Sequence, residues 1–163
     1  MDIEKLTAQF QRALSEAQML SLRMDHAFIE PVHILHGLLH VSDSAVRQIL
    51  LRAQADLSKL EDELMAMMQV MTKVTGPGSQ MVQLSRASAK VLSASGQIAS
   101  QRGDDYVSGD CFLEALFETG DELSSVLASV GATETGCRAA IDAVRSGERV
   151  ADPQAESKQQ ALA

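Results

Sequence analysis

The segment 30–40 carries four side chains that could ligate a metal ion: Glu30, His33, His36 and His40. Successive residues of an α-helix turn by about 100°, so the three imidazoles would fall within roughly 60° of one another. They could therefore meet one ion. A metal-binding helical protein is one hypothesis that this spacing raises.

The apolar residues of the same segment favour a purely structural helix. They centre on one side of the helix, nearly opposite the imidazoles: Ile34, Leu35, Leu38 and Leu39. We therefore expect the histidines to lie mostly on the side away from the core, with His36 and His40 in water, and the sequence leaves open whether His33 is a buried hydrogen-bonding residue. The sequence holds no second ligand cluster, whereas zinc sites normally draw ligands from more than one element, so we expect no metal.

Sequence signatures of catalysis are absent. The chain has no Gly-x-Ser-x-Gly motif, and neither Cys111 nor Cys137 has a catalytic context, so both are expected to be reduced core residues. The glycines at 76 and 78 are not followed by the Lys-Ser/Thr of a phosphate-binding loop. We expect neither enzymatic activity nor a cofactor in this segment.

Length and composition limit the class of protein. The 163 residues suffice for one well-cored domain, and 45 % hydrophobic with 22 % charged residues is typical of a globular chain. A net charge of −8 disfavours nucleic acid and anionic membranes as partners. Because no stretch is apolar enough to span a membrane and no signal peptide opens the chain, we expect a cytoplasmic protein.

Apolar periodicity and scarce aromatic residues, 3 % of the chain, predict an all-α fold. The first four helices are expected over 3–24, over 31–40 with Pro31 in the first turn, from a cap at Ser42 or Asp43 to Arg52, and from a cap at Asp56 to about Met71. Gly76-Pro77-Gly78-Ser79 then predicts a loop.

The sequence after this loop repeats the sequence before it. A shift of 78 positions aligns the apolar residues Leu6 with Leu84, Leu14 with Leu92, Ile34 with Phe112 and Leu38 with Leu116, and one deletion then aligns Leu64 with Ile141. The three histidines instead align with Cys111, Glu114 and Glu118, so ligands are not repeated. We expect eight helices in two pseudo-twofold-related repeats, about 1–75 and 79–147, packed as one domain of residues 1–147.

Residues 148–163 lose the helical periodicity, gain charge and contain Pro153. This composition is typical of a linker, which we expect to lead toward a further module.

Three motifs resemble the Clp N-terminal domain, a double-repeat module that precedes the ATPase rings of Clp/AAA+ unfoldases. They are Leu-Thr-Ala-Gln-Phe-Gln-Arg-Ala-Leu at 6–14, Phe-Ile-Glu-Pro-Val-His-Ile-Leu at 28–35 and Arg-Gly-Asp-Asp-Tyr-Val at 102–107. Within the family the motifs and the tail after Gly147 are most similar to the ClpB disaggregase branch. The resemblance implies that residues 148–163 lead to an AAA+ module that uses ATP and magnesium and assembles as a hexameric ring.

The resemblance also implies a function and a site. The domain would bind exposed apolar segments of misfolded or aggregated polypeptides, for threading by the ring, in a groove between the repeats. By position, Thr7, Asp104 and Asp110 would edge that groove, with Asp110 standing where ClpB proteins usually have Glu. The alternative within the family is an N-domain that docks folded adaptors, as in peptidase-coupled ClpA or ClpC unfoldases.

Overall fold

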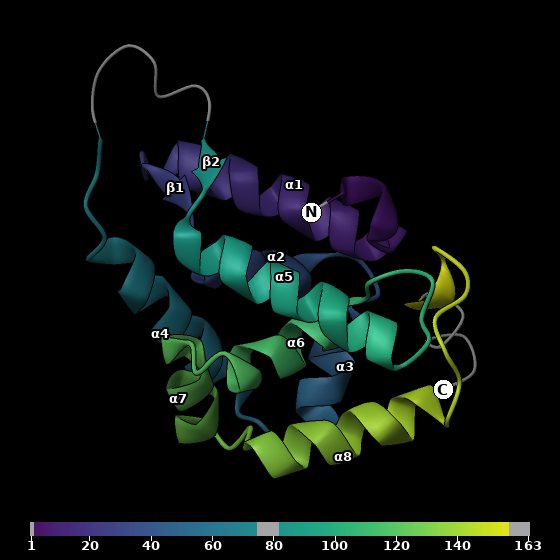
Figure 1. Cartoon of the computed structure of the whole chain (residues 1–163). Helices are drawn as coiled ribbons and strands as arrows, with labels where there is room; N and C mark the ends of the chain where they lie inside the picture. The colour runs from purple at the N-terminus through teal and green to yellow at the C-terminus, as the bar shows by residue number, and fades with distance from the viewer. Residues whose placement is uncertain (1, 75–81, 157–163) are drawn as a thin grey trace.

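The computed structural model describes residues 2–74 and 82–156 (Figure 1). Over these residues the chain forms eight α-helices, which confirms the all-α prediction, together with one 3₁₀ turn at Ile3–Lys5 and two short strands. The helices are α1 (Ala8–Arg23), α2 (Pro31–His40), α3 (Ala45–Arg52), α4 (Leu57–Gln69), α5 (Arg86–Gln101), α6 (Gly109–Glu118), α7 (Glu122–Ser129) and α8 (Glu134–Arg145). The expected loop at 76–79 lies outside the described residues.

The helices confirm the duplication. Helices α1 and α5 both have 16 residues, α2 and α6 both have 10, and α3 and α7 both have 8. The starts of α1 and α5, and of α2 and α6, differ by 78 positions. The starts of α3 and α7, and of α4 and α8, differ by 77 positions, as the single deletion requires. None of the described helices is long and apolar enough to cross a membrane.

Hydroxyl and carboxylate caps set several helix starts. The first predicted helix breaks at Leu6, and the Thr7 hydroxyl then accepts the Phe10 N–H to begin α1. Ser85 caps α5 at the equivalent position. Helix α3 is capped by Ser44, one residue after the predicted Asp43, because Asp43 takes a positive φ of 57° that turns the chain into the helix.

The two repeats pair their backbones twice, in a way that the helical pattern did not predict. Strand β1 (Phe28–Ile29) runs parallel to β2 (Gln83–Leu84), so a segment preceding α2 bonds to one preceding α5. The equivalent bridge joins Leu6, before α1, to Val107, before α6. In each repeat, therefore, the segment before the first helix pairs with the segment before the second helix of the other repeat.

Helices α2 and α6 form the centre of the molecule, between α1 and α5 on one side and α8 on the other (Figure 1). Eight of the ten residues of each are buried. Phe10 of α1 packs edge-to-face against Phe112 of α6, with ring centroids 5.9 Å apart, which joins the repeats through the core. Gly37 lets α2 approach the Ala13 carbonyl of α1 directly.

The structure decides the placement of His33, which the sequence leaves open. His33 is fully buried, because α2 is covered by other helices around most of its circumference and has no solvent side at that point. The Glu30 N–H donates to its Nδ1 at 2.8 Å, so the neutral ring carries its proton on Nε2, which lies 2.7 Å from His26 Nδ1. His36 and His40 stack on each other, and His40 pairs with Glu61 at 3.1 Å. In the ranges 2–74 and 82–156, no three His, Cys, Asp or Glu side chains form a group that could hold a metal ion.

Replacing Gly37 by Ala is expected to destabilise the domain. A Cβ at this position would overlap the Ala13 backbone carbonyl, and overpacking of this kind costs about 1–3 kcal/mol. That cost exceeds the gain in helix propensity of at most about 1 kcal/mol. Urea denaturation of Gly37→Ala should show a lower midpoint, and an unchanged or higher midpoint would contradict the close packing.

The buried histidine pair predicts a loss of stability in acid. Burial, followed by the neighbouring His26, lowers the pKa of His33 to about 4, whereas the unfolded residue titrates near 6.5. Between these values the unfolded chain binds a proton at His33 that the folded chain excludes, so the contribution of this residue to stability falls as pH drops, by about 3 kcal/mol in total. Relative to wild type, His33→Gln should therefore gain about that much between pH 7.5 and pH 4 in urea denaturation. A difference that does not change with pH would refute this role.

Candidate functional site

An apolar groove lies between α1 and α5, the first helices of the two repeats, which run side by side (Figure 1). It has a volume of about 260 Å³ and is lined by Ile3, Leu6, Gln11, Leu14, Ser15, Gln18, Ile29, Leu84 and Leu92. Leu6 and Leu84 are repeat-equivalent, as are Leu14 and Leu92. The groove thus lies where the two repeats meet on their pseudo-twofold axis.

A larger hollow continues the groove along α5. It has a volume of about 580 Å³ and shares Leu84 and Leu92 with the groove, so the two form one surface, which we call the α1/α5 groove. Its remaining walls are small or amide-bearing: Ala89, Ser93, Gly96, Gln97, Ser100 and Gln101. Ile3 is 57 % exposed and Leu84 40 % exposed, so apolar side chains here are open to a ligand.

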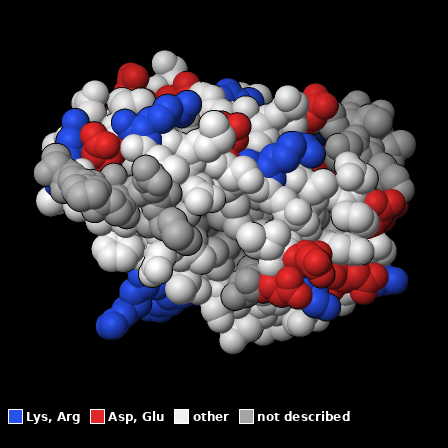
Figure 2. Space-filling view, turned by 90° about the horizontal axis from the view of Figure 1, so that it is seen from above, with Lys and Arg blue, Asp and Glu red and all other residues white. Residues whose placement is uncertain are grey.

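The groove is uncharged. Among the described residues that line it, none is Asp, Glu, Lys or Arg. Figure 2, which views the molecule from above, shows charged side chains in separate clusters with wide uncharged areas between them. Such a surface offers apolar burial and amide hydrogen bonds, which suit a polypeptide segment of mixed sequence.

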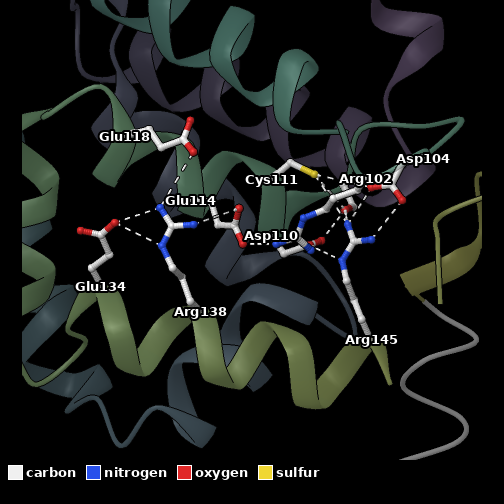
Figure 3. A network of polar contacts seen from close by, with 10 residues as sticks. Arg102, Asp104, Asp110, Cys111, Glu114, Glu118, Glu134, Arg138 and Arg145 are labelled. Carbon is white, nitrogen blue, oxygen red and sulfur yellow. Dashed lines mark hydrogen bonds and ion pairs between the residues drawn. The ribbon is translucent and has the colours of Figure 1, made fainter. Parts of the chain in front are cut away.

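One cluster of charged side chains surrounds Arg145, at the end of α8 (Figure 3). The guanidinium donates from both terminal nitrogens to Asp104, at 3.1 and 2.9 Å, and from Nε to Asp110 Oδ2 at 2.7 Å. It also donates to the Ser108 hydroxyl at 3.1 Å. We call these four residues the Arg145 junction. Although burial opposes its charge, Asp110 and Asp104 raise the pKa of Arg145 above its ordinary value.

Of the three expected groove-edge residues, Asp104 and Asp110 belong to this junction, and none of the three lines the groove. The Asp104 side chain is fully buried and Asp110 is 3 % exposed, both facing Arg145. Thr7 is fully buried as the cap of α1, and its N–H donates to the Val107 carbonyl. The three residues are therefore brought to one region, the meeting point of α1, α6 and α8, but none is open to solvent.

The ion pairs extend from the junction along the α6–α8 interface (Figure 3). Arg102 pairs with Glu114 and lies 3.6 Å from Asp110. Arg138 reaches Glu114, Glu118 and Glu134, at 3.7, 3.9 and 2.9 Å. Cys111 lies inside the network, and burial, with Asp110, raises the pKa of its thiol to about 12, so it stays neutral. Cys111 and Cys137 are both buried and free, as expected.

Residues 148–156, within the expected linker, pack against the domain; we call them the strap. Val150 is 1 % exposed, its N–H donates to Asp104 Oδ1 at 2.8 Å and its carbonyl accepts the Asp105 N–H at 2.7 Å. The Pro153 carbonyl then accepts the Ala8 N–H at the start of α1, at 2.9 Å. The chain therefore remains packed against the domain beyond residue 147. The strap lacks helical periodicity and is held by separate contacts of individual residues.

Glu156 anchors the end of the strap. Its Oε2 accepts the Gly109 N–H at the start of α6, at 3.2 Å, and the side chain is 98 % enclosed, with a relative exposure of 2 %. Burial raises the pKa of Glu156 to about 7, with Asp110 adding to the rise and Arg12 opposing it. The docked carboxyl is therefore readily protonated near neutral pH.

Glu156→Gln is expected to make strap docking insensitive to pH. The folded pKa of Glu156 is raised above the unfolded value of 4.5, so the contribution of this carboxyl to wild-type stability is full below pH 4.5 and falls by about 3 kcal/mol as pH rises to 7. The Gln side chain keeps an acceptor for Gly109 but cannot ionise. Hydrogen exchange of the Ala8 and Gly109 amides should accelerate between pH 5 and pH 8, beyond its intrinsic rise, only in wild type. Equal acceleration in both proteins would exclude Glu156 as the cause.

Comparison with known proteins places this geometry in a family. The model of the Clp repeat (R) N-terminal domain matches residues 5–130. The chain is 37 % identical to "Chaperone protein ClpB" of Vibrio cholerae over 162 residues, 99 % of this chain and 19 % of that protein. It is 38 % identical to ClpB of Dichelobacter nodosus over 159 residues, 98 % of this chain and 18 % of the relative. The chain thus spans about a fifth of the length of these relatives.

Solved structures share the fold. The Hsp104 N-terminal domain from Candida albicans superposes with a TM-score of 0.82 at 18 % identity, covering 93 % of this chain and 99 % of that one. The N-terminal domain of the ClpV1 ATPase from E. coli EAEC gives a TM-score of 0.73 at 20 % identity, covering 84 % and 83 %. The sequence matches and the duplicated four-helix architecture agree, and the chain belongs to the Clp repeat N-terminal domain family.

Proposed function

We propose that this domain is the substrate-engaging N-terminal domain of a ClpB-type disaggregase and that it binds exposed apolar segments of unfolded polypeptides in the α1/α5 groove. The observation that carries the proposal is the groove itself, open, apolar and uncharged. The matches to ClpB chaperones over nearly the whole chain support the same assignment.

The proposal assigns the remaining steps to the rest of the parent protein. The parent is an AAA+ ATPase that uses ATP and magnesium, assembles as a hexameric ring in the cytoplasm and threads the captured polypeptide. The domain itself holds the polypeptide and hydrolyses no ATP. Weak binding suits this role, because a segment handed to the ring must leave the groove.

Thr7, Asp104 and Asp110 act in this proposal as positioning residues. Thr7 starts α1, which forms one wall of the groove, and follows directly after Leu6 in its floor. Asp104 and Asp110 bind Arg145 and so hold the end of α8 against the loop before α6. The same loop pairs with Leu6 through Val107. Asp104 also accepts the Val150 N–H, and the strap then reaches the Ala8 N–H of α1, so these carboxylates help to place the first helix of the first repeat and with it one wall of the groove.

Adaptor docking is the alternative within the family, because the family match fits ClpA- and ClpC-type domains as well. The two functions differ in the ligand. A disaggregase domain binds unfolded chains directly, whereas an adaptor-docking domain binds the surface of a folded protein and leaves unfolded chains in solution.

The double variant Ile3→Ser, Leu84→Ser should weaken binding of an unfolded model protein at least fivefold, because both exposed apolar side chains line the groove. Fluorescence anisotropy with a reduced, carboxymethylated protein gives the affinity. Leu51→Ser is the matched control, since Leu51 is 51 % exposed on α3, outside the groove. No binding by wild type, or equal binding by the groove variant and wild type, would refute the proposal.

A further inference from the structure

A separate hollow lies where α2, α5 and α7 begin and α4 ends. It has a volume of about 420 Å³, and we call it the α2 hollow. Its apolar wall includes Pro31, Met67, Met71 and Leu123, and Val70 on its edge is 86 % exposed. None of its lining residues belongs to the α1/α5 groove.

The repeat relates this hollow to the place where the strap docks. Pro31, at the start of α2, is equivalent to Gly109 at the start of α6, and Leu123 of α7 is equivalent to Val46 of α3. A Cβ on Gly109 would lie 2.8 Å from Val46 Cγ2 and 3.6 Å from Glu156 Oε2, so the strap carboxylate and Val46 meet there. The strap thus fills this site in the second repeat, whereas none of the described residues fills the equivalent site in the first repeat.

The start of the neighbouring helix gives a further correspondence. Ala87, in the first turn of α5, lines the α2 hollow, and α5 is the equivalent of α1. At the start of α1, the Ala8 N–H donates to the strap carbonyl of Pro153. The equivalent of Ala8 is Arg86, and no described residue outside α5 accepts from the N–H groups of Arg86 or Ala87. A segment in the α2 hollow would therefore accept from the first turn of α5 as the strap accepts from the first turn of α1.

The two sites favour ligand groups of opposite charge. Gly109 offers an N–H to the Glu156 carboxylate, whereas Pro31 has no N–H to offer. The α2 hollow is edged instead by Glu30, Asp121 and Glu122, and its described lining includes no Lys or Arg. A carboxylate would be repelled there, and a Lys or Arg side chain would be attracted.

We propose that the α2 hollow is a second docking site, for a short segment of a separate polypeptide that follows a path like that of the strap and carries Lys or Arg where the strap carries Glu156. Apolar neighbours of the basic residue would pack on Met67, Met71 and Val70, whose flexible or exposed side chains suit varied partners. This site is independent of the proposed function of the α1/α5 groove.

The test titrates the ¹⁵N-labelled domain with the capped peptide Ala-Leu-Pro-Ala-Lys-Leu-Lys-Ala and with its twin that has Glu in place of both Lys. The Lys peptide should shift the amides of Ala87, Glu122 and Leu123, with binding that weakens as salt is added, and the Glu twin should bind at least fivefold more weakly. The double variant Val70→Ser, Glu122→Gln should lose at least fivefold in affinity for the Lys peptide. Leu51→Ser, exposed on α3, should bind like wild type.

Several results would overturn the proposal. These are equal affinity for the two peptides, no amide shifts around the hollow, or the same affinity in the Val70/Glu122 variant. Shifts confined to Ile3 and Leu84 would overturn it while leaving the proposed function of the groove intact. Shifts of the hollow amides on raising the domain concentration without peptide would show that a second copy occupies the site, which also excludes the proposal.

Discussion

The fold depends most on one buried cation. Arg145 is 6 % exposed, and its charge is stable there because Asp104 and Asp110 accept from all three of its nitrogens. Removing one partner from a buried ion pair typically costs about 3–5 kcal/mol, since the other charge is left without compensation. Asp104 also accepts the Val150 N–H, so the same carboxylate fixes the strap to the loop before α6.

The chain carries a net charge of −8, yet none of the described residues that line the groove is charged. Asp104, Asp110 and Glu114 neutralise arginines within the protein and do not face the groove. The floor and walls of the groove are then supplied by equivalent apolar residues of the two repeats, Leu6 with Leu84 and Leu14 with Leu92. Duplication therefore builds the proposed binding surface, while the ion pairs of Arg102, Arg138 and Arg145 hold together the helices of the second repeat.

Much of the fold follows from the sequence, because helix periodicity and the 78-residue repeat are local or regular signals. Part of the groove lining also follows from the sequence, because the aligned leucine pairs 6 with 84 and 14 with 92 line the groove. The contact between His33 and His26 does not, because His26 lies outside α2 and the helix wheel of α2 gives no information on residues of other segments. The Arg145 junction and the strap were missed for a different reason. Arg145 and Asp104 are 41 residues apart, and no local pattern reports such a contact.

The central claim is that polypeptides bind between the repeats and do not bind at the buried carboxylates. Methyl spectra and arginine side-chain NMR spectra of the labelled domain, recorded while a carboxymethylated unfolded protein is added, test it most directly. The account predicts that the methyl signals of Ile3, Leu14, Leu84 and Leu92 shift together along one binding curve, while the Thr7 methyl and the Arg145 side-chain signals stay in place. Shifts centred on Thr7 and Arg145, with the groove leucines unmoved, would contradict it.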